Sequence, residues 1–387
     1  MRPAAFLVAV LRCVGSGRGI ALLTACLAGP AVAEDVAFAA VRPGTTLSLP
    51  RDHGSHPAFR TEWWYVTGWL RTEAGEDLGF QVTFFRSRPG TVATGNPSAF
   101  TPHEVIITHA ALADAHRGRL WHDQRSARAA LGLAGATPGD LRVWLDRWSL
   151  RACPGIAHGH DRDRSCVGQG ASFVTRIDAA GFALALEFAP TQAPLLHGEG
   201  GLSRKGASPL AASWYYSLPQ LGVTGRVTRG AHVARVTGTA WLDHEWSSEY
   251  LEAGASGWDW IGLDLDDGGA LMAFRIRDAQ QRTRWAGGTL RNAQGRVRVF
   301  SPPEVVFTPG RRWRSPRTGI EYPVEWRVTA GDFAIALRPF MDDQESDTRR
   351  STGAVYWEGA VTALRDGRRV GRGYLELTGY GEPLRLR

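Results

Sequence analysis

The stretch EWWYVTGWLR at residues 62–71 decides the fold, because it is dense in aromatic and β-branched side chains. Alternation of side chains along a strand puts Trp63 and Tyr65 on one face and Trp64 on the other. A second run of the same kind, LGFQVTFFRSR, follows at residues 78–88 after a short loop that contains glycine. The pair predicts a hairpin whose first strand is covered on both faces and lies deep in a sheet.

The rest of the chain repeats this pattern of short β-type runs separated by Gly-containing turns. The 387 residues include 46 glycines and 15 tryptophans, and no long segment has the period of a helix. We therefore predict an all-β protein with two consecutive antiparallel barrels. The stretch 218–228 contains Pro and Gly and predicts a boundary between an N-terminal domain at 34–225 and a C-terminal domain at 226–387.

The first 33 residues have the features of an export signal. Basic residues precede an apolar run at 20–28, and Ala31-Val32-Ala33 forms a small-residue cleavage site. A lipoprotein signal with an acylated Cys26, which would anchor the protein to a membrane, is the alternative. We favour soluble export to the periplasm or the extracellular space, because the apolar run continues past Cys26 to the cleavage site.

Composition and charge exclude two classes of function. An apolar fraction of 43% with 21% charged residues is typical of a globular protein and excludes disorder as the main state. The net charge of +7 falls to about +4 when the three arginines of the signal are removed. This excess is too small and too scattered to predict binding to nucleic acid.

Two of the four cysteines, Cys153 and Cys166, remain after removal of the signal. In an exported chain, such a pair around a short loop predicts a disulfide bond. A metal site is the alternative, because the loop between them also contains His158, His160, Asp161 and Asp163. We favour the disulfide, since the Cys-x-x-Cys spacing of structural zinc sites is missing.

The segment Trp241-Leu242-Asp243-His244-Glu245-Trp246-Ser247-Ser248 concentrates reactive side chains near the middle of the chain. A carboxylate beside an imidazole can set its tautomer and raise its pKa, as a general acid or base requires. His244 is therefore a candidate catalytic residue. The alternative is a packed histidine that satisfies buried backbone at a domain junction, because neighbours on an extended chain point to opposite faces.

The acidic residue of Trp258-Asp259-Trp260 emerges on a strand face that is otherwise apolar. If that face lines a pocket, loss of water would raise the pKa of Asp259 and keep a proton available near neutral pH. If the strand end is exposed, Asp259 is a solvated residue at the edge.

Three further glutamates lie within or beside strand patterns. Glu62, Glu358 and Glu376 adjoin Trp and Tyr residues, and we interpret them as buried partners of indole N–H and hydroxyl groups. The sequence contains no nucleophile elbow, no Gly-rich phosphate loop and no His-Glu-x-x-His helix. No metal or other cofactor is therefore predicted, and nothing presents Ser247 or Ser248 as a nucleophile.

Four segments together resemble the secreted, lipocalin-like relatives of carotenoid 1,2-hydratase (hydroxyneurosporene synthase), a group often labelled only as predicted secreted hydrolases. The segments are Glu62-Trp63-Trp64-Tyr65-Val66-Thr67-Gly68, Ser213-Trp214-Tyr215-Tyr216-Ser217, Asp243-His244-Glu245-Trp246-Ser247-Ser248 and Gly373-Tyr374-Leu375-Glu376-Leu377-Thr378-Gly379-Tyr380. The resemblance implies two consecutive lipocalin-like (calycin-type) β-barrels. It also implies addition of water, without a cofactor, to the terminal double bond of an acyclic carotenoid.

That reaction needs an acid that protonates the alkene, aromatic faces that stabilise the cation, and a base for water. The resemblance implies that His244 and Trp246 match the His-x-Trp pattern of the hydratases, with Asp259 as the proton donor and Trp258 or Trp260 as the aromatic wall. We add Trp64 and Tyr65 to the candidate substrate-binding residues.

The sequence thus predicts an exported, lipocalin-like protein that binds a hydrophobic, isoprenoid or lipid-like ligand and hydrates a double bond in it. Three alternatives stay open: a non-catalytic carrier of such a ligand, an uncharacterised hydrolase, and a structural partner in an envelope assembly. Association with a membrane, peripheral or through Cys26, is compatible with each of them.

Overall fold

A computed structural model describes residues 34–35, 38–89, 91–92, 103–153 and 172–384. The predicted signal, with Cys26, lies outside these residues, as do Cys166 and the histidines and aspartates between the two cysteines. The described part of the chain contains strands and two short 3-10 turns, η1 (Arg51–His53) and η2 (Pro302–Glu304), and no α-helix. It accordingly holds no helix that is long and apolar enough to cross a membrane.

Thirteen of the described strands form the first sheet, which is antiparallel throughout. Eleven of them follow one another in the order β6-β5-β3-β2-β15-β14-β11-β10-β9-β8-β7, and β12 and β13 pair with β14. Their bounds are β2 (Thr61–Thr72), β3 (Asp77–Ser87), β5 (Val105–Ala113), β6 (Trp121–Arg128), β7 (Ala134–Ala136), β8 (Arg142–Leu145), β9 (Trp148–Cys153), β10 (Ser172–Ala179), β11 (Phe182–Ala189), β12 (Leu195–Leu196), β13 (Leu202–Arg204), β14 (Ala212–Arg229) and β15 (His232–Glu249).

The second sheet has ten described strands, in the order β19-β18-β17-β16-β27-β26-β24-β23-β20, with β25 paired to β26. Their bounds are β16 (Gly257–Leu265), β17 (Ala270–Arg277), β18 (Thr283–Arg291), β19 (Val297–Phe300), β20 (Val305–Pro309), β23 (Trp326–Ala330), β24 (Phe333–Pro339), β25 (Glu345–Thr348), β26 (Ala354–Arg365) and β27 (Arg368–Leu377). Two small pairs complete the description, β1 (Glu34–Asp35) with β4 (Thr91–Val92) and β21 (Arg312–Arg314) with β22 (Glu321–Pro323).

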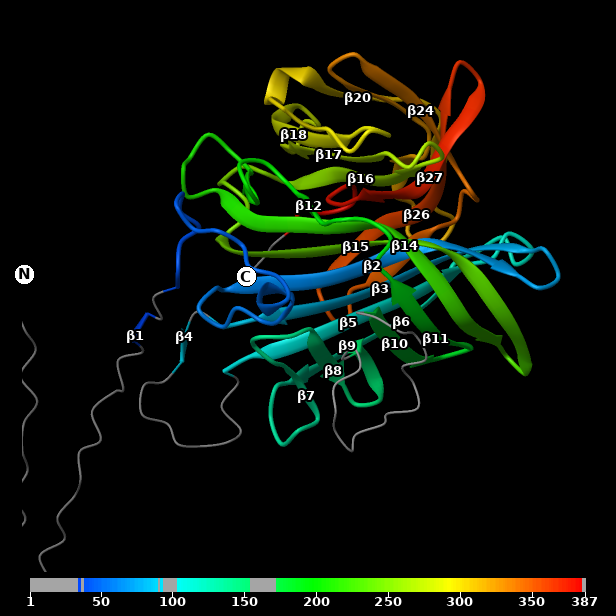
Figure 1. Ribbon diagram of the computed structural model, residues 1–387, viewed down its shortest axis with the longest axis horizontal. Coiled ribbons are helices and arrows are strands. Elements are labelled where there is room, and N and C mark those ends of the chain that lie inside the picture. The colour runs from blue at the N-terminus through cyan, green and yellow to red at the C-terminus, as the bar shows by residue number, and fades with distance from the viewer. Residues whose placement is uncertain (1–33, 36–37, 90, 93–102, 154–171, 385–387) are drawn as a thin grey trace, which may run out of the picture.

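Both sheets curl on themselves. In the first, the end strands β6 and β7 come into contact, so the sheet is a nearly closed barrel. In the second, β20 at one end reaches β17 and β18 near the other end. Figure 1 shows the second sheet stacked on the first, with β14, β15 and β2 of the first facing β16, β26 and β27 of the second. The predicted all-β, two-barrel class is confirmed.

Apolar side chains form three main layers of core. One fills the first barrel and includes Trp64, Phe80 and Trp148, and a second fills the other barrel around Trp326 and Trp357. The third lies between the two barrels, and its members come from the outer faces of both sheets, among them Tyr65, Trp241, Trp260, Phe274 and Tyr374. The strands at the junction are therefore covered on both faces, as the alternation in residues 62–71 predicts.

The domain boundary predicted after residue 225 lies within a strand of the first sheet. It falls inside β14, which forms a long hairpin with β15 in the middle of the first sheet, and the chain passes to the second sheet only between Glu249 and Gly257. Pro219 suggested a break between domains, but it lies where the pairing register of β14 with β15 shifts, between Leu218 and Leu221. A bulge of this kind tolerates a proline within a strand.

The two barrels approach each other closely at Gly79 on β3. A methyl group at this position would lie 2.8 Å from both the Ala360 Cβ and the Tyr374 Oη of the second barrel. We therefore expect Gly79→Ala to lower the free energy of unfolding by about 1–3 kcal/mol, the usual cost of overpacking. Urea titration followed by tryptophan fluorescence measures the change.

Gly222→Ala is the matched control, since a methyl group there meets no atom closer than 3.8 Å. It should leave stability unchanged or raise it slightly, because alanine restricts the unfolded chain. Equal stability of the two variants would show that the barrels do not pack as described.

Candidate functional site

A small cavity lies between the outer faces of the two barrels and has a volume of about 70 Å³. Aromatic side chains from both sheets line it, among them Trp63, Tyr65, Tyr215, Trp258 and Trp260. Four carboxyl groups line it as well: Asp243, Glu245 and Glu358, which are buried, and Glu376, which is half-buried. A larger groove of about 730 Å³ elsewhere has no such set, since its Asp77 is paired with Arg71 and Arg372.

The alternation of β15 delivers two of these carboxylates. Asp243 and Glu245 share the strand face that looks toward the second barrel, whereas His244 and Trp246 look into the first. The whole segment 241–248 lies within β15 rather than at the end of a strand. Neighbours in this segment therefore belong to two different sites.

Asp243 is held in place by three donors. The Tyr215 hydroxyl donates to Oδ2 at 2.7 Å, the Trp241 indole N–H donates to Oδ1 at 2.6 Å, and the Ser217 hydroxyl donates to Oδ1 as well. Burial raises the pKa of the Asp243 carboxyl to about 7, although these donors favour its charged form. Asp243 can therefore exchange a proton near neutral pH.

Glu245 pairs with Lys205, the one cation among the described residues that forms an ion pair with a carboxyl group of the cavity. The Lys205 ammonium lies 2.8 Å from Oε1, and both side chains are almost fully buried. The ammonium also lies over the rings of Tyr215 and Phe274. Burial raises the pKa of Glu245 and lowers that of Lys205, because loss of water disfavours the charged form of each group. The contact between the two opposite charges partly offsets both shifts. Lys205 thus balances one of the four carboxylates.

Glu358 and Glu376 stand directly opposite each other on the hydrogen-bonded strands β26 and β27. Side chains in such a pair start about 4.5–5.5 Å apart, and two buried like charges at that distance repel strongly. Burial, and then the charge of Glu376, raise the pKa of Glu358 well above its usual range. Burial also raises the pKa of Glu376 to about 7, although the Trp258 indole N–H donates to it at 2.8 Å. The pair therefore holds at least one proton at neutral pH.

Two buried polar atoms of the cavity lack a hydrogen bond. The Tyr65 Oη and the Glu358 Oε1 belong to side chains that are almost fully buried, and neither reaches hydrogen-bond geometry with any described residue. The Tyr65 and Tyr356 hydroxyls are near enough to Glu358 to oppose the rise in its pKa. Buried atoms of this kind are costly unless something else satisfies them, which points to a ligand or to water.

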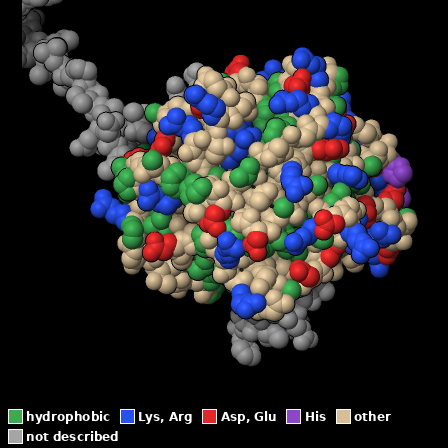
Figure 2. Space-filling model, turned by 90° about the horizontal axis from the view of Figure 1, so that it is seen from above, with side chains coloured by type: hydrophobic (Ala, Val, Ile, Leu, Met, Phe, Trp, Pro, Cys, Tyr) green, Lys and Arg blue, Asp and Glu red, His purple; other side chains and the backbone are tan. Residues whose placement is uncertain are grey.

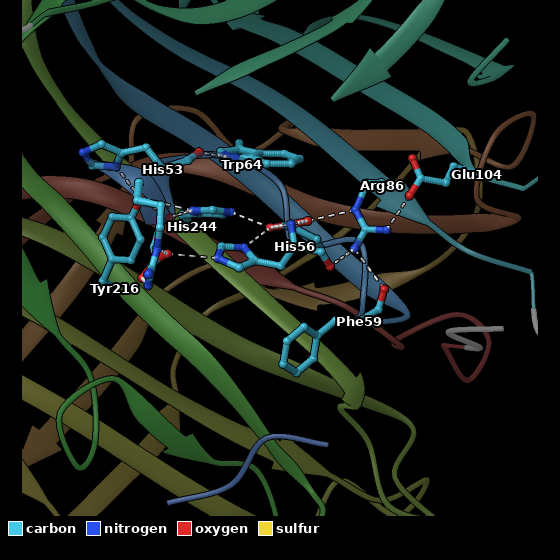
Figure 3. Close-up of polar contacts among 11 residues, drawn as sticks. His53, His56, Phe59, Trp64, Arg86, Glu104, Tyr216 and His244 are labelled. Carbon is cyan, nitrogen blue, oxygen red and sulfur yellow. Dashed lines mark hydrogen bonds and ion pairs between the residues drawn. The ribbon is translucent and has the colours of Figure 1, made fainter. Parts of the chain in front are cut away.

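His244 lies in a different place, inside the first barrel. Its Nε2 lies 2.9 Å from the Glu62 Oε1, and its Nδ1 is 3.1 Å from both the Tyr216 hydroxyl and the Asp52 carbonyl. Arg86 donates to the other oxygen of Glu62 at 2.8 Å. Figure 3 shows His244, Tyr216 and Arg86 in this network, which η1 covers.

Electrostatics in this network differ from those of the cavity. Burial alone would raise the pKa of Glu62, but hydrogen bonds from His244 and His56 bring it well below its usual range. Burial lowers the pKa of His244, against the opposing effect of Glu62. Glu62 is thus a charged, buried carboxylate that accepts hydrogen bonds from two imidazoles and a guanidinium group, rather than from the indole and hydroxyl groups expected from the sequence.

Asp259 faces neither the cavity nor His244, because β16 turns it into the second barrel. Its carboxylate is fully buried between Arg275 at 2.6 Å and Arg277 at 3.0 Å, and the Tyr380 hydroxyl donates to it at 3.0 Å. The two predicted catalytic residues therefore belong to two separate barrel interiors. A carboxylate between two guanidinium groups has the surroundings of a structural ion pair, not of a proton donor to an apolar ligand.

The predicted substrate-binding residues divide in the same way. Tyr65, Trp258 and Trp260 line the cavity. Trp64 stacks on His244 and Trp246 stacks on His56, so both belong to the first barrel. Sequence reasoning did not select the four cavity carboxylates and Lys205 as site residues, although the alternation of Asp243 with Glu245 was visible.

The disulfide prediction is supported at one end. Cys153 is in a disulfide bond, and Cys166 lies outside the described residues. Cys153 ends β9 at the edge of the loop that the sequence places between the two cysteines.

Two curled antiparallel sheets with a carboxylate-rich, aromatic cavity between them define a lipocalin-like, two-barrel protein. Residues 40–380 match the AttH-like family, and the chain belongs to that family. The crystal structure of a putative AttH from Nitrosomonas europaea is 49% identical, with a TM-score of 0.79 over 89% of this chain and 100% of that one.

A second crystal structure shares the fold at much lower identity. Kievitone hydratase from Nectria haematococca is 15% identical, with a TM-score of 0.63 over 90% of this chain and 98% of that one. No curated protein sequence matches the chain. The resemblance to the hydratase group is thus supported at the level of the fold and the AttH-like family, without the carotenoid branch.

Replacing Asp259 tests whether it is structural. We expect Asp259→Asn to lower the free energy of unfolding by about 3–5 kcal/mol, because two buried guanidinium groups lose their counter-charge. Asp332→Asn, at the exposed pair with Arg298, is the control and should change stability little. Urea titration of both proteins measures this, and wild-type stability of Asp259→Asn would contradict the structural assignment.

The raised pKa of Glu376 makes stability depend on pH. Its ordinary value is 4.5 and its value in the folded protein is about 7, so the folded protein binds this proton more tightly than the unfolded chain does. The wild type therefore loses stability as pH rises from about 4.5 to about 7. Glu376→Gln lacks the titrating group and should lose less over this range, which unfolding titrations at a series of pH values measure. Parallel pH curves for the two proteins would argue against the raised pKa.

Proposed function

We propose that the protein is a hydro-lyase that adds water to a carbon–carbon double bond of a small, largely apolar substrate. The reaction takes place in the cavity between the barrels. The observation that carries this proposal is the pair Glu358 and Glu376, which stand opposite each other in the lining of an aromatic cavity with raised pKa values. The kievitone hydratase fold and membership of the AttH-like family support it.

Glu358 acts as the acid. Its pKa is raised well above the usual range, so its carboxyl group stays protonated, and its Oε1 makes no hydrogen bond of good geometry with the described residues. Transfer of that proton to one alkene carbon forms a new C–H bond and leaves a cation on the other carbon. The faces of Trp63, Trp258 and Trp260 stabilise this cation by cation–π attraction.

Water then closes the reaction. Its oxygen bonds to the cationic carbon, and one of its protons passes to the Glu376 carboxylate, whose pKa is about 7. Glu376 stands across from Glu358, so the proton that it receives can return to Glu358 within the pair. The net change is addition of one water, and the carboxyl groups end in their starting states.

The cavity also limits the substrate. A volume of about 70 Å³ is several times smaller than the roughly 300–1,000 Å³ of pockets that enclose a whole ligand. Only one end of a longer molecule fits, such as the branched end of an acyclic isoprenoid. Since the Tyr65 Oη and the Glu358 Oε1 lack partners, we propose that the reacting end lies next to a hydroxyl group of the substrate.

Export forms part of the proposal. The disulfide at Cys153 is typical of an oxidising compartment, which agrees with the signal features of residues 1–33. We therefore place the reaction outside the cytoplasm, where the substrate reaches the protein as a free or membrane-derived molecule.

Hydration is tested with the protein lacking residues 1–33, in water enriched in ¹⁸O. Geraniol serves as an isoprenoid that carries a hydroxyl group, and neurosporene as the hydrocarbon implied by the hydratase resemblance. We expect mass spectrometry to find a product of geraniol that has gained one labelled water. Glu358→Gln should lower the rate by about 10²–10⁴, the usual contribution of a general acid.

Glu325→Gln is the control and should keep the wild-type rate, because Glu325 is half-exposed and pairs with Arg311. Saturable quenching of tryptophan fluorescence without any product would support a carrier and overturn the enzyme. Turnover of neurosporene but not of geraniol would favour a carotenoid substrate and contradict the proposal that the substrate carries a hydroxyl group. Full activity of Glu358→Gln would remove Glu358 from the mechanism.

A further inference from the structure

The second cluster of ionisable side chains lies inside the first barrel, on the opposite face of β15 from the cavity. Here His56, Glu62 and His244 bring two imidazole nitrogens and one carboxylate oxygen within 4.8 Å of one another. No other group of three His, Cys, Asp or Glu residues in the described part of the chain is placed in this way. We propose that these residues form a binding site for a divalent transition metal ion, with Zn²⁺ as the expected ion.

The distances suit such an ion. The His56 Nδ1 and the His244 Nε2 lie 2.7 and 2.9 Å from the same oxygen of the Glu62 carboxylate. Ligand atoms bound tetrahedrally to zinc at 2.0–2.2 Å are about 3.3–3.5 Å apart, so each of these two distances must lengthen by roughly half an ångström. The two nitrogens lie within 4.8 Å of each other and must move to the same tetrahedral spacing. Two imidazoles and one carboxylate are a known zinc ligand set, and they leave a fourth position open.

The surroundings of the three ligands provide the second, independent observation. Histidines that bind a metal usually donate their other ring N–H to a carbonyl or carboxylate oxygen. The Nδ1 of His244 faces the Asp52 carbonyl at 3.1 Å, and the Nε2 of His56 lies 3.7 Å from the Asp52 carboxylate. One residue thus supplies both outer contacts.

The tautomer of His244 supports the same conclusion. Without a metal, its Nε2 must carry the proton in order to donate to Glu62, so its Nδ1 has none to donate to the Asp52 carbonyl. A metal on Nε2 moves the proton to Nδ1, which can then donate it in a hydrogen bond to the Asp52 carbonyl. Metal binding therefore exchanges the hydrogen bond that Nδ1 can accept from the Tyr216 hydroxyl for one that Nδ1 donates to the Asp52 carbonyl, without a net change in the charge of the ring.

Packing holds the ligands in place. The His56 ring stacks on Trp246 with ring centroids 3.7 Å apart, and the His244 ring stacks on Trp64 at 4.8 Å. Arg86 holds the second oxygen of Glu62, which leaves the first oxygen for the ion. Figure 3 shows His56, His244 and Arg86 converging around this point.

Charge and access are also compatible with a cation. The cluster contains the carboxylates of Asp52, Glu62 and Glu104 and the guanidinium groups of Arg51 and Arg86, so one negative charge is in excess. Glu62 and His244 are fully buried, whereas the His56 side chain is 18% exposed. The ion therefore enters from the His56 side, and a water there completes its coordination.

The test uses the protein without residues 1–33, freed of any purification tag, treated with a chelator and then titrated with Co²⁺. We expect one Co²⁺ per chain, with the intense visible absorption of four-coordinate cobalt, and displacement of that signal by one equivalent of Zn²⁺. His56→Ala should weaken binding by at least about 10–100-fold, the loss seen even for outer contacts of a metal site. Elemental analysis after dialysis against Zn²⁺ checks the stoichiometry.

Two further variants keep the test decisive. His56→Asn can still donate to Glu62, so it preserves the hydrogen bond while removing the imidazole, and it should also fail to bind Co²⁺. His122→Ala removes a half-buried histidine outside the cluster and should bind as the wild type does. Absence of stoichiometric metal from the wild type, or retention of binding by both His56 variants, would overturn the proposal. These readouts do not involve catalysis, so their outcome is separate from that of the hydration assay.

Discussion

Loss of water at the junction of the two barrels is the constraint on which the chemistry depends. The junction strands are covered on both faces, so a carboxyl group there loses its hydration whichever way it points. The pKa values of Asp243 and Glu376 rise to about 7, and burial raises the pKa of Glu358 well above its usual range. A solvated sheet face with the same residues would hold charged carboxylates with no proton to give.

The partners of each carboxyl group then decide its role. Glu62 is as deeply buried as Glu358, yet its pKa moves in the opposite direction because donors surround it. Asp259, buried between two guanidinium groups, has its charge fully compensated. Burial alone therefore does not identify a proton donor. The distinguishing feature of Glu358 is burial beside another carboxyl group and without a cation.

Local patterns in the sequence were enough for the strands and for the coverage of both faces in residues 62–71. They also indicated Trp258 and Trp260 as substrate-binding residues, and both line the cavity. They could not show which barrel each strand face enters. For this reason the sequence suggested a proton donor at Asp259, which instead lies inside the second barrel in contact with two arginines. The pairing of Glu358 with Glu376 depends on the register of β26 and β27, which the sequence pattern does not fix. The proximity of His56 and His244 depends on contacts between segments that are distant in the sequence.

The register of β15 links the two sites. Asp243 and Glu245 face the cavity only because His244 and Trp246 face the first barrel, and a slip by one residue would exchange the two sets. Pairing with β2 and β14 fixes the strand on both sides, and the bond from His244 to Glu62 ties it to β2 again. The polar cluster inside the first barrel therefore positions the carboxylates of the cavity, even though it touches none of them. This accounts for the density of imidazole, carboxylate and indole groups in residues 241–248: the segment supplies both faces of a strand that is buried on each side.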